Sequence, residues 1–251
     1  MNKHLGKITE NRQLTNSAFI LSCSAEKLAK VIKPGQFCNV KVNDSYLPLL
    51  RRPFSICDVK DDVISFMINI KGIGTEILSQ KRIGDNLDIL GPFGNYFGID
   101  DEYDTAIIIA GGIGIAPFPF FVKNLKGRRI KAYFGFRNKD EVIDIGIKNA
   151  LVSTNDGSYG IKGTVLDLLN NDLINFANEK SKIFACGPTA MLKAVQNFCL
   201  NKNIKGEIST ESAMACGFGI CQGCVIDTHD EDKYKLVCKD GPIFNITEVK
   251  L

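Results

Sequence analysis

The sequence has little of what a secreted, membrane-bound or nucleic-acid-binding protein requires. Its 31 lysines and arginines nearly match its 28 aspartates and glutamates, and a net charge of +3 does not favour nucleic acid or a membrane surface as partner. The first ten residues are polar and charged rather than an apolar leader, so we expect a cytoplasmic protein. Only two histidines occur, His4 and His229, and neither lies in a motif. We therefore expect both at the surface and neither as a general base.

One apolar stretch is long enough to be tested as a membrane span. Residues 105–122 carry no charge over 18 positions, which is about the lower limit for a spanning helix. Three glycines and two prolines interrupt this stretch. A buried parallel strand that runs into a glycine-rich turn fits the pattern better, so we expect no membrane segment.

Nine cysteines are an odd number for a chain that shows no export signal, which argues against a disulfide framework. Five of them are scattered, as small buried side chains usually are: Cys23, Cys38, Cys57, Cys186 and Cys199. The other four fall within 23 residues near the C-terminus: Cys216, Cys221, Cys224 and Cys238. Such a cluster requires a different explanation.

The first part of the chain is typical of an antiparallel β-barrel. Residues 5–98 contain several short strand patterns, and residues 62–70 alternate between apolar and polar side chains. Turn residues such as Gly35, Pro48 and Gly91-Pro92 separate these strands. The pattern predicts a barrel domain over residues 1–99. One helix is expected inside it, over residues 75–79, with Thr75 able to cap it.

After an acidic stretch at residues 100–102, which we interpret as a linker, strands alternate with helices. We expect buried strands at 106–110, 130–136 and 182–185, and helices at 117–125 and 189–200. This alternation predicts a parallel sheet with helices on both faces, in an α/β domain over residues 100–205. Residues 206–251 are too few for a hydrophobic core of their own, so we expect a small lobe that folds around a metal centre. The expected fold class is multidomain, β plus α/β.

The spacing of the clustered cysteines is Cys-x4-Cys-x2-Cys, followed after thirteen residues by Cys238. The first three match plant-type 2Fe–2S ferredoxins, and four thiolates are what a two-iron cluster requires. The alternative is a structural zinc site, but such sites usually show two well-separated Cys-x2-Cys pairs. The pattern therefore predicts a 2Fe–2S cluster held by Cys216, Cys221, Cys224 and Cys238, without a complete ferredoxin fold.

Two motifs in the barrel segment indicate a flavin nucleotide. The first, Arg51-Arg52-Pro53-Phe54-Ser55-Ile56, combines a guanidinium that can hold a pyrophosphate, an aromatic ring that can lie against a flavin or adenine, and a hydroxyl. The second, Gly72-Ile73-Gly74-Thr75, opens a helix about twenty residues later, where backbone N–H groups favour a phosphate. An Arg-Arg pair alone is usually a solvated strand end, so the prediction rests on both motifs together.

Two turns in the α/β segment indicate a nicotinamide dinucleotide. Gly111-Gly112-Ile113-Gly114 follows a buried strand and precedes a helix, although it is not the Rossmann Gly-x-Gly-x-x-Gly. Cys186-Gly187-Pro188 follows a later strand in the same way. Because the carboxyl ends of parallel strands share one edge of the sheet, we expect both turns at one site. In isolation Cys186 would be interpreted as a core residue.

Taken together, the motifs resemble the ferredoxin-NADP reductase superfamily. The resemblance rests on Arg52-Pro53-Phe54-Ser55, Gly74-Thr75, Gly91-Pro92-Phe93-Gly94, Gly111 to Gly114 and Cys186-Gly187-Pro188. The tail, from Glu211 to Cys221 and again from Val237 to Pro242, is similar to the electron-transfer subunits of NAD-linked, type B dihydroorotate dehydrogenases. The match covers essentially the whole chain. Phe54 stands where many superfamily members have tyrosine, which removes a hydroxyl but keeps the ring.

The resemblance implies a set of cofactors, partners and contacts. It implies FAD on the barrel, NAD(H) on the α/β domain and the 2Fe–2S cluster in the C-terminal lobe. It also implies an FMN-containing catalytic subunit that oxidises dihydroorotate in pyrimidine (UMP) biosynthesis. The implied assembly is a cytoplasmic heterotetramer with two copies of each subunit. FAD contacts are implied for Arg52, Pro53, Phe54, Ser55, Met67, Ile68, Asn69, Gly74 and Thr75, and dinucleotide contacts for Gly111, Gly112, Gly114, Gly187, Pro188 and Cys186, the last near the nicotinamide.

These cofactors suggest a relay. Nicotinamide exchanges two electrons as hydride and an iron–sulfur cluster takes one at a time, so FAD must stand between them. The hypothesis is that electrons pass from the partner's FMN through the cluster and FAD to NAD+. The cluster must then lie near the partner, and exposed Ile220 and Val225 are where we expect docking.

Alternatives remain at this stage. Within the same fold they are a subunit of another NAD(P)H–ferredoxin, sulfide or hydrogenase-type oxidoreductase; outside it, a zinc or redox-sensor protein. The choice between NAD and NADP depends on two segments. Residues 137–139 could accept a 2′-phosphate, whereas Asp156 could repel one, and the resemblance favours NAD.

Overall fold

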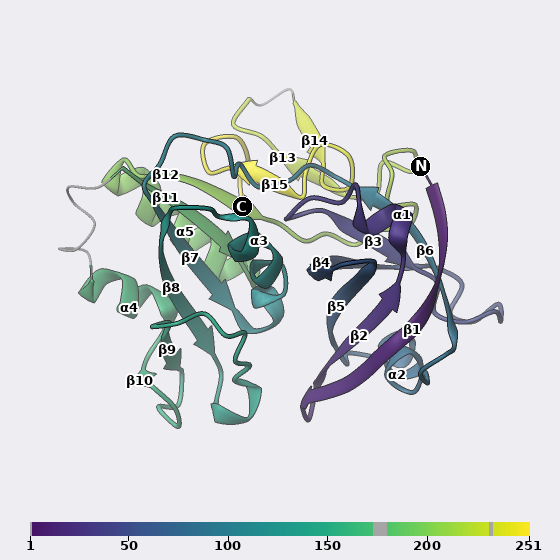
Figure 1. Ribbon diagram of the computed structural model, residues 1–251. Helices are drawn as coiled ribbons and strands as arrows, with labels where there is room; N and C mark the ends of the chain where they lie inside the picture. The colour runs from purple at the N-terminus through teal and green to yellow at the C-terminus, as the bar shows by residue number, and fades with distance from the viewer. Residues whose placement is uncertain (1, 173–179, 231–232) are drawn as a thin grey trace.

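The computed structural model describes residues 2–172, 180–230 and 233–251, and its first half is a closed six-stranded barrel (Figure 1). Its strands lie in the order β1-β2-β5-β4-β3-β6, and every neighbouring pair is antiparallel. The predicted barrel is confirmed. Its elements are β1 (Asn2–Thr15), β2 (Ala18–Ser24), α1 (Glu26–Ala29), β3 (Phe37–Val40), β4 (Arg52–Lys60), β5 (Val63–Asn69), α2 (Ile73–Ser79) and β6 (Asn86–Phe93).

The strand period explains how the barrel is filled. On β5, Ile64, Phe66 and Ile68 point inward and are wholly buried, as the alternation over residues 62–70 predicts. Met67 faces the other way and is also buried, because it packs into the core of the α/β half. β5 is therefore a strand with cores on both sides, and the two halves of the molecule are packed together there.

The short helix α2 begins earlier than expected. Its N-cap is Gly72, and Thr75 lies in the first turn, where its hydroxyl accepts hydrogen bonds from the backbone N–H groups of Lys71 (2.9 Å) and Gly72 (3.2 Å). The expectation that Thr75 caps the helix from outside was wrong in position, although its side chain does bind the otherwise unpaired N–H groups.

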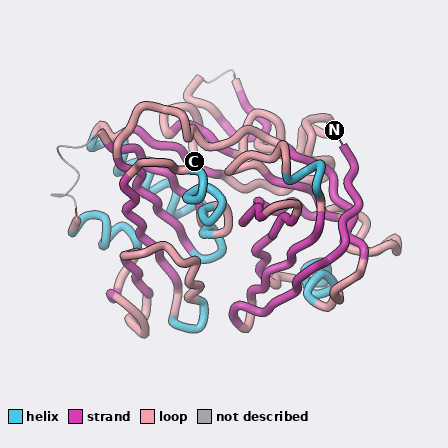
Figure 2. The backbone as a smooth tube through the Cα atoms, viewed as in Figure 1, coloured by secondary structure: helices cyan, strands magenta, loops and turns pink. Residues whose placement is uncertain are grey.

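The second half is a seven-stranded sheet with helices on both faces. The strand order is β10-β9-β8-β7-β11-β12-β15, parallel throughout except for the last pair. Figure 2 shows most of the helical segments gathered in this half. Its elements are β7 (Thr105–Gly111), η1 (Gly112–Ile115), α3 (Phe118–Asn124), β8 (Arg129–Phe136), η2 (Lys139–Glu141), β9 (Leu151–Thr154), β10 (Ile161–Lys162), α4 (Val165–Asn171), β11 (Ser181–Cys186), α5 (Thr189–Lys202), β12 (Lys205–Ser209) and β15 (Ile243–Asn245).

The alternating burial of β7 confirms the predicted layers. Ile107 and Ile109 pack with α4 and α5 on one face, while Ile108 packs with α3 on the other. All seven residues of β7 are buried, which is why its sequence is a continuous apolar run. The stretch tested as a membrane span is this strand, followed by η1 and α3. Among the described residues, no helix combines the length and the apolar character that crossing a membrane demands.

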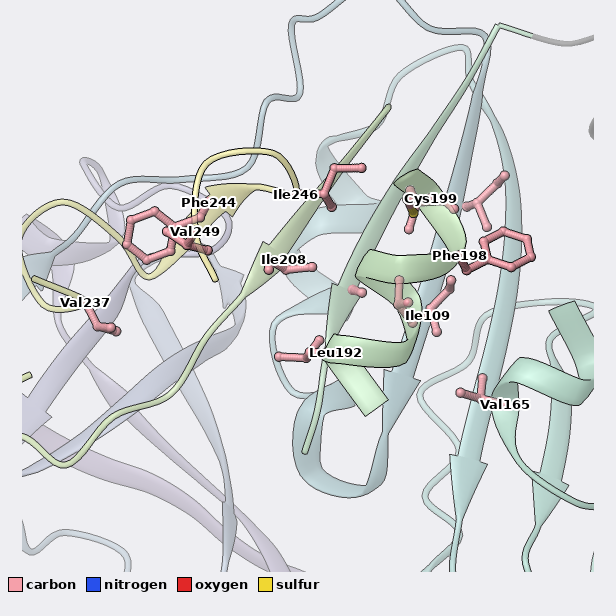
Figure 3. Close-up of a cluster of buried hydrophobic side chains, with 14 of the residues drawn as sticks. Ile109, Val165, Leu192, Phe198, Cys199, Ile208, Val237, Phe244, Ile246 and Val249 are labelled. Atoms are coloured by element: carbon pink, nitrogen blue, oxygen red, sulfur yellow. The ribbon is translucent and has the colours of Figure 1, made fainter. Parts of the chain in front are cut away.

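The C-terminal segment packs onto the α/β half. After the hairpin of β13 (Val225–Asp227) and β14 (Tyr234–Leu236), β15 pairs with β12, and Figure 3 shows Phe244, Ile246 and Val249 near Ile208. The side-chain amide of Gln196 on α5 donates to the carbonyls of residues 246 (2.6 Å) and 249 (2.7 Å). The segment therefore shares a core and does not rely on a metal centre alone for its packing.

The predicted domain boundaries stay predictions. The division near residue 100 falls between the end of β6 at Phe93 and the start of β7 at Thr105. The division at residue 206 falls inside β12, a strand of the seven-stranded sheet.

Candidate functional site

The structure brings the four clustered cysteines together as two pairs. The side chains of Cys216 and Cys221 interact with each other, and so do those of Cys224 and Cys238. Backbone N–H groups also point at the sulfurs: those of Phe218 and Cys221 lie 3.5 and 3.4 Å from the Cys216 sulfur, and that of Cys238 lies 3.4 Å from the Cys224 sulfur. Gly217 and Gly219, with φ of +77° and +89°, let the loop turn around the sulfurs.

These contacts change the acidity of the thiols. Burial opposes ionisation of Cys216, but the hydrogen bonds from Cys221 and Phe218 outweigh it and lower its pKa to about 6. Burial and the neighbouring Cys224 raise the pKa of Cys238 to about 12. Cys216 is therefore largely a thiolate at neutral pH, and Cys238 would lose its proton on binding iron.

The donor set of these four side chains is the one that a 2Fe–2S cluster requires. The four thiols lie together as two pairs, and backbone amides are directed at the sulfurs. Iron–sulfur clusters are held by cysteine thiolates and are tuned by hydrogen bonds to the sulfurs. The residues therefore fit the predicted 2Fe–2S cluster.

The cysteine loop reaches the surface on one side only. Cys224 and Cys238 are buried, whereas Cys221 is exposed. Ile220 is 75% exposed and Val225 is 47% exposed, as expected for the predicted docking face. An exposed apolar side chain next to a redox ligand would let a partner approach closely.

The two flavin motifs also meet. A Cβ atom placed on Gly74 would lie 3.1 Å from Nε of Arg52, so the guanidinium of β4 rests against the start of α2. The structure separates the two arginines. Arg51 is paired with Asp88 (2.9 Å) and also donates to its carbonyl, whereas Arg52 has no carboxylate partner in the part of the chain that the structure describes. Arg52 donates to the Leu50 carbonyl (2.7 Å) and keeps its charge unpaired by a carboxylate, which suits it to a phosphate.

The other predicted FAD residues differ in accessibility. Pro53, Phe54 and Ser55 follow Arg52 on β4 and are half-buried, and the Phe54 ring lies 6.3 Å from that of Phe66. Asn69 is half-buried at the end of β5, but Met67 and Ile68 are 5% and 1% exposed. A cofactor could reach Ile68 only through its backbone.

The two nicotinamide motifs lie against each other. β7 and β11 are parallel neighbours, with Ala110 opposite Cys186. A Cβ atom on Gly114 would lie 2.3 Å from the Cys186 carbonyl oxygen, and one on Gly187 would lie 2.9 Å from the Gly111 nitrogen. Gly111 also faces Pro188, at 2.9 Å from a virtual Cβ to Cδ, and Gly112 has φ +53°. Only glycines allow this approach, and the turns form one edge, as expected.

Cys186 is neutral and has neighbours that the sequence did not reveal. It is 4% exposed, and burial, followed by the charge of Glu211, raises its pKa to about 12 against a hydrogen bond with Ser209. Ser209 lies directly opposite Cys186 in the parallel register of β11 and β12. Ser209 could be placed beside Cys186 only once the pairing of β11 with β12 is known.

We expect the five scattered thiols to make the folded protein less stable at alkaline pH. Burial raises the pKa of Cys23, Cys57, Cys186 and Cys199 from 9.0 to about 12. A raised pKa means that the thiol is more acidic in the unfolded chain, so its stabilisation is complete below pH 9 and is lost as the pH rises towards 12. Each thiol should lower the free energy of unfolding by about 1.4 kcal/mol per pH unit in that window. Urea unfolding at pH 7, 9 and 11 measures this slope, and Cys199→Ala should make it shallower; an unchanged slope would contradict the assignment.

The segments that bear on NAD or NADP lie side by side. The backbone N–H of Lys139 donates to the Ser158 hydroxyl (2.8 Å), and that hydroxyl donates to Asp156 (2.6 Å). The hydrogen bonds that Asp156 accepts from the hydroxyl and the backbone N–H of Ser158 lower the pKa of Asp156, so its carboxylate is charged. Arg137 is paired with Glu141 at 2.5 Å. The two segments that the sequence associates with the nucleotide preference thus hold a charged carboxylate and an arginine that is already paired.

Comparisons with known proteins give a consistent picture. A family model described as "Iron-sulfur cluster binding domain of dihydroorotate dehydrogenase B" matches residues 211–250. The "Dihydroorotate dehydrogenase B (NAD(+)), electron transfer subunit" of Bacillus pumilus is 34% identical over 262 residues, covering 100% of this chain and 99% of the relative. That of Clostridium acetobutylicum is 37% identical over 249 residues, covering 98% and 96%.

Solved structures share the fold. That of an NADH-dependent reduced ferredoxin-NADP oxidoreductase, described for flavin-based electron bifurcation, superposes with a TM-score of 0.86 at 27% identity, over 98% of this chain and 89% of that one. A ferredoxin NADP+ reductase from Neisseria gonorrhoeae with bound FAD and NADP has a TM-score of 0.66 at 16% identity, over 80% and 92% of the two chains. The second likeness supports the fold alone.

Proposed function

This chain belongs to the family of electron transfer subunits of NAD-linked dihydroorotate dehydrogenase B, and we propose that it carries electrons from the FMN of a catalytic subunit to NAD+. The proposal includes the stoichiometry that the family resemblance implies, two copies of each subunit. The observation that carries it is the proximity of an iron–sulfur ligand set to a flavin-type barrel: Cys216 is hydrogen bonded directly to β3, the strand beside Arg52.

Each cofactor has residues suited to hold it. Bound FAD would exchange hydride with nicotinamide and single electrons with an iron–sulfur cluster. Arg52 and the N–H groups beside Gly74 would hold its pyrophosphate, because the guanidinium already lies there without a carboxylate. Phe54 would lie against a ring and Ser55 would supply a hydroxyl at the flavin edge.

The nicotinamide site would be formed by the two glycine turns. Gly111, Gly114 and Gly187 let the two turns pack against each other, whereas a Cβ atom on Gly112 would meet no protein atom within 4 Å. A dinucleotide can therefore approach the backbone at Gly112. Cys186 would face the nicotinamide as a neutral thiol, since its pKa is about 12. It would orient the ring and exclude water rather than donate or accept a proton at neutral pH.

The test uses the complex purified from its natural source through a tag on this chain. If the proposal is right, added dihydroorotate reduces NAD+, and FMN, FAD and two irons per copy of this chain are recovered. If dihydroorotate does nothing while NADH still reduces an artificial dye, the flavoprotein assignment stands. The dihydroorotate assignment would then give way to another NAD(P)H-linked oxidoreductase.

We expect the preference for NADH over NADPH to depend on Asp156. Replacing it with alanine removes the carboxylate expected to bond the ribose and repel a 2′-phosphate. NADH should become a poorer reductant of bound FAD by about tenfold, and NADPH a better one, since one charge-assisted hydrogen bond is worth about 1.5 kcal/mol or more. The two reductants are compared by the rate of flavin bleaching. Asp140→Ala in the facing loop is the control, and equal NADH and NADPH rates in the parent would contradict the assignment.

A further inference from the structure

One buried amide joins the cysteine loop to the barrel. Asn39 lies on β3, is 2% exposed, and its side-chain N–H donates to the carbonyl of Cys216 at 3.2 Å. The two residues are 177 positions apart in the sequence. Cys216 is one of the four predicted cluster ligands, so this hydrogen bond holds the peptide that carries a ligand.

The loop passes directly over this amide. A Cβ atom on Gly217 would lie 2.0 Å from Nδ2 of Asn39, closer than real atoms can approach. Gly217 also has φ +77°, which side chains rarely adopt. Glycine at position 217 therefore allows both the close approach to Asn39 and the backbone turn next to Cys216.

The same residue lies beside the predicted flavin strand. Asn39 is paired with Pro53, and its neighbour Val40 with Arg52. Three aromatic rings also connect the cysteine loop to β3. The ring of Phe218 stacks on that of Phe93 (centroids 6.2 Å apart), and the Phe93 ring contacts that of Phe37 (5.7 Å). Phe37 is paired with Ser55 of β4. β3 is thus the single strand between the cysteine loop and β4.

We propose that Asn39 is a positioning residue that fixes the Cys216 loop against β4 and thereby sets the rate of electron transfer between flavin and cluster. This inference rests on the function proposed above. Groups that orient metal ligands commonly contribute about 10–100-fold to activity without touching the metal. Asn39 would do so through the backbone of Cys216 rather than through its sulfur.

A second asparagine allows this role to be tested without losing the lobe. Asn95 binds the stretch after Cys238, donating to the carbonyls of Asp240 (3.0 Å) and Ile243 (2.6 Å) and accepting from the Ile243 N–H (2.9 Å). These three hydrogen bonds and the core around Phe244 remain when the Asn39 amide is removed. The lobe should stay docked, with only the Cys216 loop released.

The experiment compares Asn39→Asp and Asn39→Leu in the purified complex mixed anaerobically with excess NADH. Each hydride brings two electrons to the flavin; one reduces a ferric iron of the cluster and the other stays on the flavin until a further acceptor takes it. Flavin bleaching should match the parent, iron and sulfide should be retained, and the electron paramagnetic resonance signal of the reduced cluster should rise about tenfold more slowly. Asn11→Asp is the matched control, because Asn11 also donates to backbone carbonyls of the barrel, but beside α2.

Three results would overturn the inference: cluster reduction at the parental rate, equal slowing of flavin bleaching, or loss of iron in proportion to the loss of rate. The last would mean that Asn39 serves only to build the site. Failure of the proposed function looks different. In that case the parent complex itself would show no signal of a reduced cluster with NADH.

Discussion

We expect Cys216→Ser to abolish dihydroorotate-driven reduction of NAD+ while leaving reduction of bound FAD by NADH largely intact. Cys216 accepts two backbone N–H hydrogen bonds at its sulfur and has a pKa of about 6. Iron–sulfur clusters require soft thiolate ligands. A serine hydroxyl would stay protonated and leave one iron with a missing ligand. The path to the catalytic subunit is then cut, whereas the nicotinamide turns and β4 are unchanged.

Three measurements on the purified complex check this expectation: turnover with dihydroorotate and NAD+, turnover with NADH and a dye, and iron content. The control is Cys199→Ala, which removes a thiol buried between α5 and the sheet, away from the cysteine loop. It should keep both activities. A Cys216→Ser complex that still couples dihydroorotate to NAD+ would show that electrons bypass the cluster, and the relay would be wrong.

The sequence predicts best where one element is buried by its own neighbours. Residues 106–110, 130–136 and 182–185 were expected as strands and lie in β7, β8 and β11. Residues 106–110 are an unbroken apolar run, and each of the other two segments contains a single lysine, because helices cover both faces of a parallel sheet. Similarly, α5 ends at Lys202, and Asn203 in the left-handed conformation stops it. Local patterns and local burial agree in these segments.

Other elements carried a signal that the sequence analysis did not use. α4 begins with a capping box, in which Thr164 and Asp167 bind each other's backbone N–H groups. The pattern Thr-x-x-Asp before an apolar run predicts the start of this helix. The antiparallel pairing of β15 with β12 is different, because no local pattern predicts which distant strand covers a sheet edge.

The site divides in the same way. The sequence predicts that the four cysteines gather and that the two glycine turns meet, because their spacing is typical of cluster and phosphate binding, and the structure brings each group together. Ser209 beside Cys186 required the strand register, and Asn39 beside Cys216 required the docking of two distant segments. His229 is exposed as expected, whereas His4 is half-buried near the Gly91 carbonyl (3.3 Å). Nothing in Arg51-Arg52 itself indicates which arginine is free.

We expect a second large effect at Arg52, the arginine without a carboxylate partner: Arg52→Ala should weaken FAD binding by about 10–100-fold. The guanidinium rests against Gly74 at the start of α2, where it would form charge-assisted hydrogen bonds to a pyrophosphate. Losing hydrogen bonds to a charged group costs about 1.5–3 kcal/mol of binding free energy. This cost corresponds to an increase of about 10–100-fold in the dissociation constant. Arg52→Lys should fall in between, because lysine keeps the charge but not the planar fork.

Arg51→Ala is the matched control, one residue away on the chain. Arg51 is bound to the side chain and carbonyl of Asp88, so its loss should lower the melting temperature by leaving a largely buried carboxylate with only Lys3 at 3.2 Å. FAD affinity, measured by titrating the deflavinated protein, should remain close to that of the parent. If instead Arg51→Ala released FAD and Arg52→Ala retained it, the pyrophosphate would be held on the other side of β4, and the contact between Arg52 and Gly74 would be a packing contact of the barrel alone.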